Sequence, residues 1–564
     1  MSKVALGVLA SGPAADAVTQ HVPQLVADRF ASRLFLKDPT LWGPDAESES
    51  AIRLSWVGLG RTSRPLLGEV AALRDHLAEQ GFDHIVLCGM GGSSLAPEVI
   101  CATAGVELTV LDSSHPDSVR NALNDRLNRA VVVVSSKSGS TVETDSQRRA
   151  FEDAFTRAGI APTQRIVIVT DPGSPLDTDA RAAGYRVINA DPNVGGRYSA
   201  LTAFGLVPSG LAGVDLEQLL DEAESVSDLL ADDDEANPAL RLGAAIAGTQ
   251  PLRDKLVLVD KGSGIPGFAD WAEQLIAEST GKNGTGVLPV VVQDDQDPEV
   301  RSPAPEITVA RFVADSAGID GDDDTMPTSS DQSRSEVQVS GSLGAQLLLW
   351  EVATAAAGRI LGINPFDQPD VESAKKATRG LLEATDAKPD PAVFIDGAIE
   401  VRALGGDWLA GATTVASAVD SLLSQLDPQH GYVSIMAYLD RLTDTTLAQA
   451  RRAIANRTLA PTTFGWGPRF LHSTGQYHKG GPATGVYLQI TAAPHQDLAI
   501  PGRNFTFGDF ITAQAGGDAQ VLADRGRPVL RLHLTEHDAG LAQLNGILGL
   551  DRQAGSRTGS TAGA

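Results

Sequence analysis

The chain contains very little cysteine and no long apolar run, and each absence excludes a class of protein. Only Cys88 and Cys101 occur in 564 residues, too few for a disulfide framework. No stretch of 18 or more uninterrupted apolar residues is present, so we expect no membrane-spanning helix. The first residues also lack a clean secretion-signal pattern, because their apolar run is short. We therefore expect a cytoplasmic protein without membrane attachment.

Positive charge is scarce as well. The sequence has 45 Lys and Arg against 71 Asp and Glu, a formal net charge of −26 at pH 7. A surface of that sign repels a phosphate backbone, so nucleic acid is not an expected partner. A small anionic substrate is not excluded, since a single pocket can be positive on an acidic protein. The His-x-x-x-His and Cys-x-x-Cys spacings of common metal sites are missing too, and we expect no metal and no cofactor.

Short apolar strands alternate with helical patterns along most of the chain. Examples are "HIVLC" (His84–Cys88), "AVVVVS" (Ala130–Ser135) and "KLVLVD" (Lys255–Asp260), each followed by a turn and a helical stretch. Continuous apolar strands with helices between them are typical of a parallel sheet covered on both faces. The sequence therefore predicts an α/β fold with two doubly wound parallel-sheet domains and a C-terminal α/β unit.

Changes in composition give the predicted boundaries. The acidic "ADDDEANP" (Ala231–Pro238) separates the two main domains, and the polar, acidic stretch 315–336 is expected to be a mobile loop. The predicted parts are an N-terminal helical segment (1–49), a first domain (50–232), a second domain (239–389), a C-terminal α/β extension (390–552) and a small, polar, disordered tail (553–564).

Two turns that follow buried strands have the composition of anion-binding loops. "CGMGGSSLAPE" (Cys88–Glu98) is rich in glycine, which lets backbone N–H groups approach an anion at a helix start. The alternative is a tight strand–helix turn that needs glycine for its own geometry. "SSKSGSTVET" (Ser135–Thr144) places five hydroxyl groups around Lys137, whereas an ordinary helix cap needs one. This second stretch favours a phosphate monoester. It does not have the P-loop spacing.

Two further stretches contribute a cation and a carboxylate. "DPNVGGRYSALT" (Asp191–Thr202) places Arg197 after two glycines, where a guanidinium can face an anion or form a structural ion pair. In "WAEQLIAESTGKNG" (Trp271–Gly284), Gln274 and Glu278 share one helix face. Glu278 lies near the C-terminal end, where the helix dipole disfavours a carboxylate. It is therefore a candidate base, with a solvated surface glutamate as the alternative.

A fifth stretch, "NPFDQPDVESAK" (Asn364–Lys375), interrupts two helices with a polar, Pro-flanked corner. Taken together and in this order, the five stretches resemble glucose-6-phosphate isomerases, a family built from two sugar-isomerase (SIS) domains. The resemblance covers about residues 60–380. It includes "GMGGSSLAPE", "SKSGSTVET", "GGRYS", "EQLIAESTGK" and "FDQPDVESAK".

The resemblance implies a role for each of these residues. Glu278 would be the base that moves a proton between C2 and C1 of the sugar, and Arg197 would stabilise the enediolate between those steps. Lys375 would face the ring oxygen and assist ring opening. Contacts to the sugar and its phosphate would come from Gly92, Ser93, Ser136, Lys137, Ser138, Thr141, Gln274 and Gln368.

The chain departs from this family in its histidines. The family uses a histidine for ring opening between the glutamate and the "FDQ" stretch, but this sequence has no histidine between His115 and His430. A polar loop in the C-terminal part, "WGPRFLHSTGQYHKGGP" (Trp466–Pro482), offers a replacement. We expect His478, with His472 as the second choice, to reach the sugar site from the same or a neighbouring subunit. A structural loop is the alternative.

The C-terminal extension resembles the isomerase half of transaldolase–isomerase fusion proteins, and no transaldolase activity is expected. The leading function is interconversion of glucose 6-phosphate and fructose 6-phosphate, with mannose 6-phosphate acceptance as a variant. A non-catalytic sugar-phosphate sensor is the alternative from another class, and it would need no base. The expected partner is a small sugar phosphate. The resemblance implies a homodimer, with a monomer as the alternative.

Overall fold

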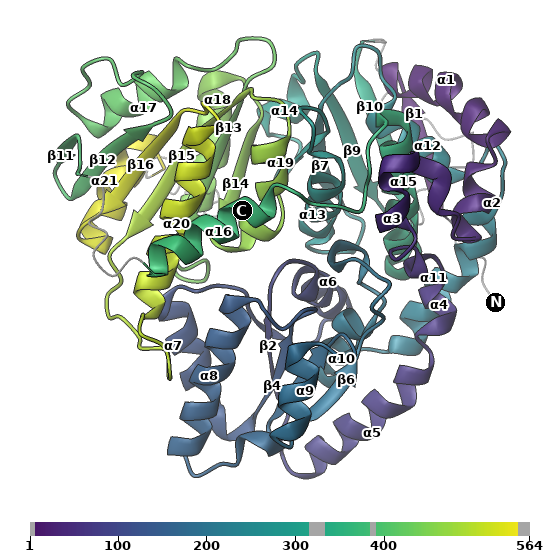
Figure 1. Ribbon diagram of the computed structural model, residues 1–564. Helices are drawn as coiled ribbons and strands as arrows, with labels where there is room; N and C mark the ends of the chain where they lie inside the picture. Colours follow the sequence, from purple (N-terminus) through teal and green to yellow (C-terminus); the bar gives the residue numbers. More distant parts are fainter. Residues whose placement is uncertain (1–5, 315–332, 384–390, 551–564) are drawn as a thin grey trace, which may run out of the picture.

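The computed structural model describes residues 6–314, 333–383 and 391–550. The described residues form three sheets, each the centre of one α/β unit. Figure 1 shows the first unit below the other two, which lie side by side above it. The predicted α/β class is confirmed. The predicted tail (553–564) and most of the predicted acidic loop lie outside the described residues, and the predicted domain boundaries stay predictions.

The first unit is a parallel sheet of strand order β3-β2-β4-β5-β6. The three central strands β2, β4 and β5 are buried along their whole length because apolar residues dominate them and helices cover both faces. The strands are β2 (His84–Gly89), β3 (Thr109–Leu111), β4 (Ala130–Ser135), β5 (Ile166–Thr170) and β6 (Arg186–Asn189). The helices are α5 (Pro65–Glu79), α6 (Leu95–Ala104), α7 (Pro116–Asn124), α8 (Val142–Arg157), α9 (Pro175–Ala182) and α10 (Ala203–Ala212).

The second unit has strand order β1-β10-β9-β7-β8. Its strands are β1 (Gly7–Ser11), β7 (Lys255–Lys261), β8 (Leu288–Val291), β9 (Ile307–Val313) and β10 (Ser335–Ser340). Its helices are α1 (Pro13–Ala27), α2 (Phe30–Phe35), α3 (Pro44–Ser50), α4 (Leu59–Thr62), α11 (Leu216–Ala231), α12 (Pro238–Ala247), α13 (Phe268–Thr280), α14 (Pro298–Arg301) and α15 (Leu343–Leu361).

Part of this second sheet was not expected from the sequence. The segment 1–49, predicted as helical, contributes strand β1, which pairs antiparallel with β10 at the sheet edge. Strand β10 also begins at Ser335, inside the stretch predicted as a polar loop. Both strands are short and carry few consecutive apolar residues, so only their pairing partners make them recognisable as strands.

The third unit has a mixed sheet of order β11-β12-β16-β15-β13-β14. Its strands are β11 (Phe394–Asp396), β12 (Ile399–Leu404), β13 (Tyr432–Tyr438), β14 (Thr462–Trp466), β15 (Gly485–Ala492) and β16 (Val529–Leu534). Its helices are α17 (Val415–Leu423), α18 (Ala450–Thr458), α19 (Gly475–Gly480), α20 (Phe507–Asp524) and α21 (His537–Leu548). Helix α16 (Val371–Glu383) connects the second and third units and packs on α20, where Thr378 lies against Gly517. No helix in the described part of the chain combines the length and apolar character needed to cross a bilayer.

Buried ion pairs join the third unit to both of the others. Arg451 on α18 binds Asp297 and Glu299 beside α14, with 2.7 Å between its guanidinium and Oε1 of Glu299. Arg469 binds Glu98 and Asp112 of the first unit. Because these charges are largely removed from water, each partner depends on the other for its solvation. The third unit is therefore a fixed part of the molecule.

We expect Arg451→Met to lower the free energy of unfolding by about 3 kcal/mol, because Glu299 would stay buried without its cation. Arg457→Met is the matched control, since Arg457 lies on the same helix but pairs with Asp420 in an exposed position. Urea unfolding of both variants measures the difference. Equal losses in the two variants would show that burial of the Arg451 pair does not matter.

Candidate active site

The predicted anion loops meet at the carboxyl edge of the first sheet. Strands β2 and β4 are neighbours although β3 lies between them in the chain, and Gly89 pairs with Ser135 at their last position. The chain leaves these two strands in opposite directions to reach helices α6 and α8. This point of reversal is where open α/β sheets bind their ligands. The turn at Gly91–Ser93 and the loop at Ser136–Thr141 therefore share one crevice.

The Ser/Thr loop is built to hold an anion at the start of α8. Ser136 Oγ accepts a hydrogen bond from the backbone N–H of Gly139 (3.1 Å) and donates to Thr141 Oγ1 (3.3 Å). Ser138 and Ser140 are exposed, and their hydroxyl groups are 2.7 Å apart. Thr141 immediately precedes the 16-residue helix, so the backbone N–H groups that follow it lie at the positive end of the helix dipole.

Lys137 does not direct its side chain into this loop. Its Nζ lies 2.6 Å from Asp171 Oδ2 and donates to the carbonyl oxygen of Pro192 (3.2 Å). The predicted contact of Lys137 with the anion is thus limited to its backbone. The lysine side chain instead connects the loop to Asp171, which follows β5.

Close backbone packing explains two glycines of the first turn. A Cβ at Gly92 would overlap the carbonyl oxygen of Gly196, and a Cβ at Gly91 would lie 2.7 Å from Gln274 Nε2. Gly91 also has φ of +56°. The turn therefore brings Arg197 and helix α13 directly against the end of β2, with Ser93 half-buried beside them.

Arg197 and Glu278 form a buried charge pair at the centre of the site. The Arg197 side chain is 3% exposed, and its Nη1 lies 3.5 Å from Glu278 Oε2. Its Nε donates to Ser279 Oγ at 2.8 Å, which fixes the guanidinium plane. Burial raises the pKa of the Glu278 carboxyl above its ordinary value, against the opposite effect of the Arg197 cation. Glu278 is thus a carboxylate held ready to accept a proton.

Two cations hold the Pro-flanked corner in place. Arg197 Nη2 donates to the carbonyl oxygens of Pro365 (2.6 Å) and Asp367 (3.1 Å). Lys282 Nζ donates to the carbonyl oxygens of Asn364 (2.7 Å) and Asp367 (2.6 Å) and to the Asp367 carboxylate. The carbonyl groups of the corner thus accept hydrogen bonds from buried cations, because irregular backbone lacks the regular hydrogen bonds of a helix or sheet.

The corner in turn directs Gln368 and Lys375. Gln368 Oε1 accepts from Arg197 Nη1 at 3.3 Å. Lys375, one turn into α16, lines a cavity of about 110 Å³ together with the Ser/Thr loop and a histidine from the third unit. That cavity is lined by Ser138, Ser140, Thr141, Val142, Glu143, Val371, Lys375, Thr378, Arg379, Leu382, Leu471, His472, Phe510 and Gln514.

The histidine at the site is His472, and the expectation of His478 is corrected. His478 is 1% exposed inside the third unit, with Nδ1 3.1 Å from Tyr432 OH and Nε2 3.2 Å from Ser434 Oγ. Burial lowers its pKa well below the ordinary value. Both ring nitrogens are satisfied within the core. His478 is therefore a structural residue.

His472 lies against Gly91 and faces the loop. Its Nε2 is 3.1 Å from Glu143 Oε1, and the same oxygen accepts from Gln514 Nε2 at 2.8 Å. Burial would raise the pKa of Glu143, but the hydrogen bond with His472 brings it below its ordinary value. Gln274 Nε2 donates to the His472 carbonyl oxygen at 2.8 Å, so Gln274 supports the histidine segment.

The sequence reasoning missed Lys282, Glu143 and Gln514. The first two lie inside stretches singled out for other residues, "STGKNG" and "STVET". Gln514 lies in the middle of α20, where nothing local distinguishes it from other helical glutamines. Lys282 is recognised by its contacts with the corner, and Glu143 and Gln514 by the packing of the third unit against α8.

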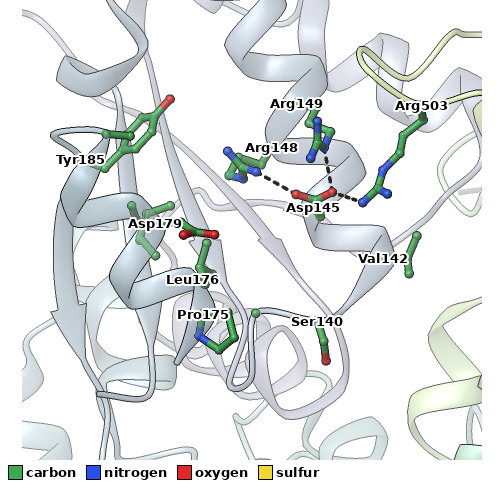
Figure 2. Close-up of a pocket in the computed structure, with 14 residues that line it drawn as sticks. Ser140, Val142, Asp145, Arg148, Arg149, Pro175, Leu176, Asp179, Tyr185 and Arg503 are labelled. Atoms are coloured by element: carbon green, nitrogen blue, oxygen red, sulfur yellow. Dashed lines mark hydrogen bonds and ion pairs between the residues drawn. The ribbon is translucent and has the colours of Figure 1, made fainter. Parts of the chain in front are cut away.

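A larger cavity, of about 370 Å³, lies behind the Ser/Thr loop between α8 and α9 (Figure 2). Three arginines line it, and all three are bound to the carboxylate of Asp145. Despite burial, these guanidinium groups lower the pKa of Asp145 to about 2. Because Arg503 comes from the third unit, we interpret the cluster as another docking contact and place the substrate on the opposite side of the loop.

We expect Lys282→Met to increase backbone exchange in the corner, because three oxygens would lose their shared donor. Hydrogen–deuterium exchange of a peptide covering 364–370 should accelerate about tenfold or more. Lys261→Met is the control, since Lys261 forms an exposed pair with Asp295. An unchanged corner peptide would show that Arg197 alone holds it.

Known proteins are similar to this chain in sequence. A probable glucose-6-phosphate isomerase of Natronomonas pharaonis is 30% identical over 356 residues, covering 56% of this chain and 83% of that protein. A similarly named protein of Haloarcula marismortui is 29% identical and covers 54% of this chain and 79% of its own. No sequence model of a protein family matches the chain.

One solved structure supports the fold alone. A hypothetical protein of Thermus thermophilus has a TM-score of 0.54 and 24% identity, and the match covers 66% of this chain and 99% of that one. The similarity in sequence to the archaeal relatives extends over most of their length. The chain therefore belongs to the glucose-6-phosphate isomerase family.

Proposed function

We propose that the chain interconverts glucose 6-phosphate and fructose 6-phosphate by ring opening and proton transfer through an enediolate. The observation that carries this proposal is the buried Glu278–Arg197 pair beside a hydroxyl-rich helix start. A base alone or an anion loop alone would fit many proteins. An aldose–ketose isomerase of phosphosugars needs three things in one crevice: a base, a cation that faces the developing oxyanion, and a phosphate-binding loop.

The phosphate is held at the start of α8. Ser136, Ser138 and Thr141 offer hydroxyl groups there, and backbone N–H groups of the loop, including that of Lys137, complete the donor set. Gln368 contributes from the corner. With the phosphate at this end, the sugar extends toward Gly92, Ser93 and the charge pair.

Proton transfer uses Glu278 and Arg197. The carboxylate removes the proton from the carbon next to the carbonyl and returns it to the neighbouring carbon, while the guanidinium faces the oxygen on which negative charge develops. The raised pKa of Glu278 suits this role, since a stronger base accepts the proton more readily. A sugar-phosphate sensor would need the loop but would gain nothing from burying this costly pair.

Ring opening is assigned to His472 and Lys375. The contact with Glu143 orients the His472 ring, which donates a proton to the sugar oxygen in this proposal. Lys375 lines the same cavity and adds a second cation. His472 thus takes the place of the histidine that the sequence lacks between His115 and His430.

The residues proposed for catalysis all come from one chain. The first unit supplies the phosphate loop and Arg197, α13 supplies Glu278, and the third unit supplies His472. A monomer can therefore catalyse the reaction, and the homodimer implied by the resemblance would not be needed for chemistry.

We expect Glu278→Gln to reduce kcat at least 100-fold on fructose 6-phosphate, with sugar-phosphate binding retained, because the amide keeps the shape but cannot accept the proton. Coupled assays and calorimetry on both proteins measure this. In the wild type, kcat/KM should fall as pH drops through the pKa of Glu278, with a midpoint above 4.5. Binding without turnover in the wild type would instead favour a sensor.

His472→Asn and His478→Asn separate the two histidines. We expect the His472 variant to lose at least tenfold in kcat on ring-closed substrate and to turn over open-chain substrate nearly normally. The His478 variant should lose stability, since it alters a buried core, but keep kcat in its folded fraction. The reverse pattern would return the ring-opening role to His478.

A further inference from the structure

A second group of ionisable side chains lies at the carboxyl edge of the third sheet. In this sheet β13 and β15 are neighbours, flanked by β14 and β16, so their carboxyl ends form the same kind of switch point as in the first unit. His495 follows β15, and His537 and Asp538 follow β16 at the start of α21. Asp440 and Asp444 follow β13. None of these residues belongs to the proposed catalytic site.

Three of these side chains have the spacing of metal ligands. His537 Nδ1 lies 3.0 Å from Asp538 Oδ1, and His495 Nε2 lies 3.8 Å from the same oxygen. The two imidazole rings are 4.5 Å apart between centroids. One ligand atom from each residue lies within 4.8 Å of the others. Tetrahedral zinc with ligands at about 2.0–2.1 Å places its donor atoms roughly 3.4 Å apart, which falls between the two measured distances.

A buried carboxylate orients the central histidine. His537 Nε2 lies 3.1 Å from Asp444 Oδ2, and the Asp444 side chain is 5% exposed. An imidazole whose Nε2–H is held by a carboxylate binds a metal ion through Nδ1 when the ion displaces the Nδ1 proton. This carboxylate–histidine arrangement is the usual support of a metal-bound histidine. Asp444 also accepts the backbone N–H of Asp440 at 3.2 Å, which fixes its own position.

Two buried polar atoms beneath the group lack partners among the described residues. They are Nε2 of His115, from the first unit, and Oδ2 of Asp440. Both side chains are at most 3% exposed. Burial lowers the pKa of His115, while the carboxylates of Asp117, Asp440 and Asp444 act in the opposite direction, as charges close to the ring do. Such orphaned groups indicate that a further polar component belongs in this junction.

We propose that His495, His537 and Asp538 bind one divalent transition-metal ion of the zinc type, with Asp444 as the positioning carboxylate. Two imidazoles and one carboxylate favour zinc over magnesium or calcium, which prefer all-oxygen ligand sets. His495 and Asp538 are exposed, so a fourth position is open to water.

The ion would connect the segment that follows β15 with the start of α21. His495 lies on the segment between β15 and α20, which also carries Arg503, and Arg503 binds Asp145 on α8 (Figure 2). A metal at His495 would therefore fasten that segment to α21 and support the docking of the third unit on the first. Its role is structural, since isomerisation is assigned to other residues.

The test uses the full chain, stripped with a chelator and titrated with Zn²⁺ by calorimetry and with Co²⁺ by visible absorption. We expect one ion per chain, a Co²⁺ spectrum of tetrahedral intensity and a higher Tm with Zn²⁺. His495→Gln and Asp538→Asn should each weaken Zn²⁺ binding at least 100-fold, and Asp444→Asn about 10–100-fold. Because His495 and Asp538 are exposed, these two variants should fold like the wild type without metal.

His76→Gln is the control, since His76 is an exposed histidine on α5 of the first unit. It should leave Zn²⁺ affinity unchanged. Wild-type affinity in His495→Gln, or the same loss in His76→Gln, would overturn the proposal. Isomerase activity of the metal-free protein is measured separately, so the failure of this site and the failure of the proposed function give different results.

Discussion

The guanidinium of Arg197 is the contact on which the site depends. It is almost fully buried, and its nitrogens face the Glu278 carboxylate, Ser279 and two carbonyl oxygens of the corner. Removing a cation from water costs several kcal/mol unless its donors are satisfied, and here acceptors from helix α13 and from the corner satisfy them. The same cation thus fixes the base, the corner and, through Gln368, the phosphate end. Lysine could not replace it, because a single ammonium lacks the planar set of donors that reaches these acceptors.

The third unit completes a site that the first two leave open. Helix α13 presents Glu278 and the corner presents Lys375, and the third unit adds the imidazole of His472 to the same crevice. His472 reaches the crevice because Arg469, three residues earlier, binds Glu98 and Asp112, and because Gln274 holds its carbonyl oxygen. Ion pairs that look like general stabilising contacts between units therefore also determine the position of His472.

The sequence predicted the parts of this molecule whose signals are local. The strands of the first sheet follow from unbroken Val and Ile runs, and the crevice follows from loops whose composition suits anions. It failed where the deciding contacts are distant. His472 and His478 are six residues apart in one polar loop, and only the tyrosines of β13 and β15 make one of them a core residue. The resemblance implied a phosphate contact for Lys137, and only the position of Asp171, after β5, shows that the lysine side chain forms an ion pair there.

Charge explains how a chain of net charge −26 can attract a dianionic sugar phosphate. The acidic residues are mostly at the surface, where salt screens them within about 10 Å. Arg197, Lys282, Lys375 and His472 lie around one crevice, and two of them are largely removed from solvent. Burying a cation away from water is unfavourable, and Lys282 shows this, since burial lowers its pKa to about 8. The corner carbonyls and Asp367 offset that cost, and this need for acceptors explains why a polar, proline-flanked corner interrupts two helices at this point in the chain.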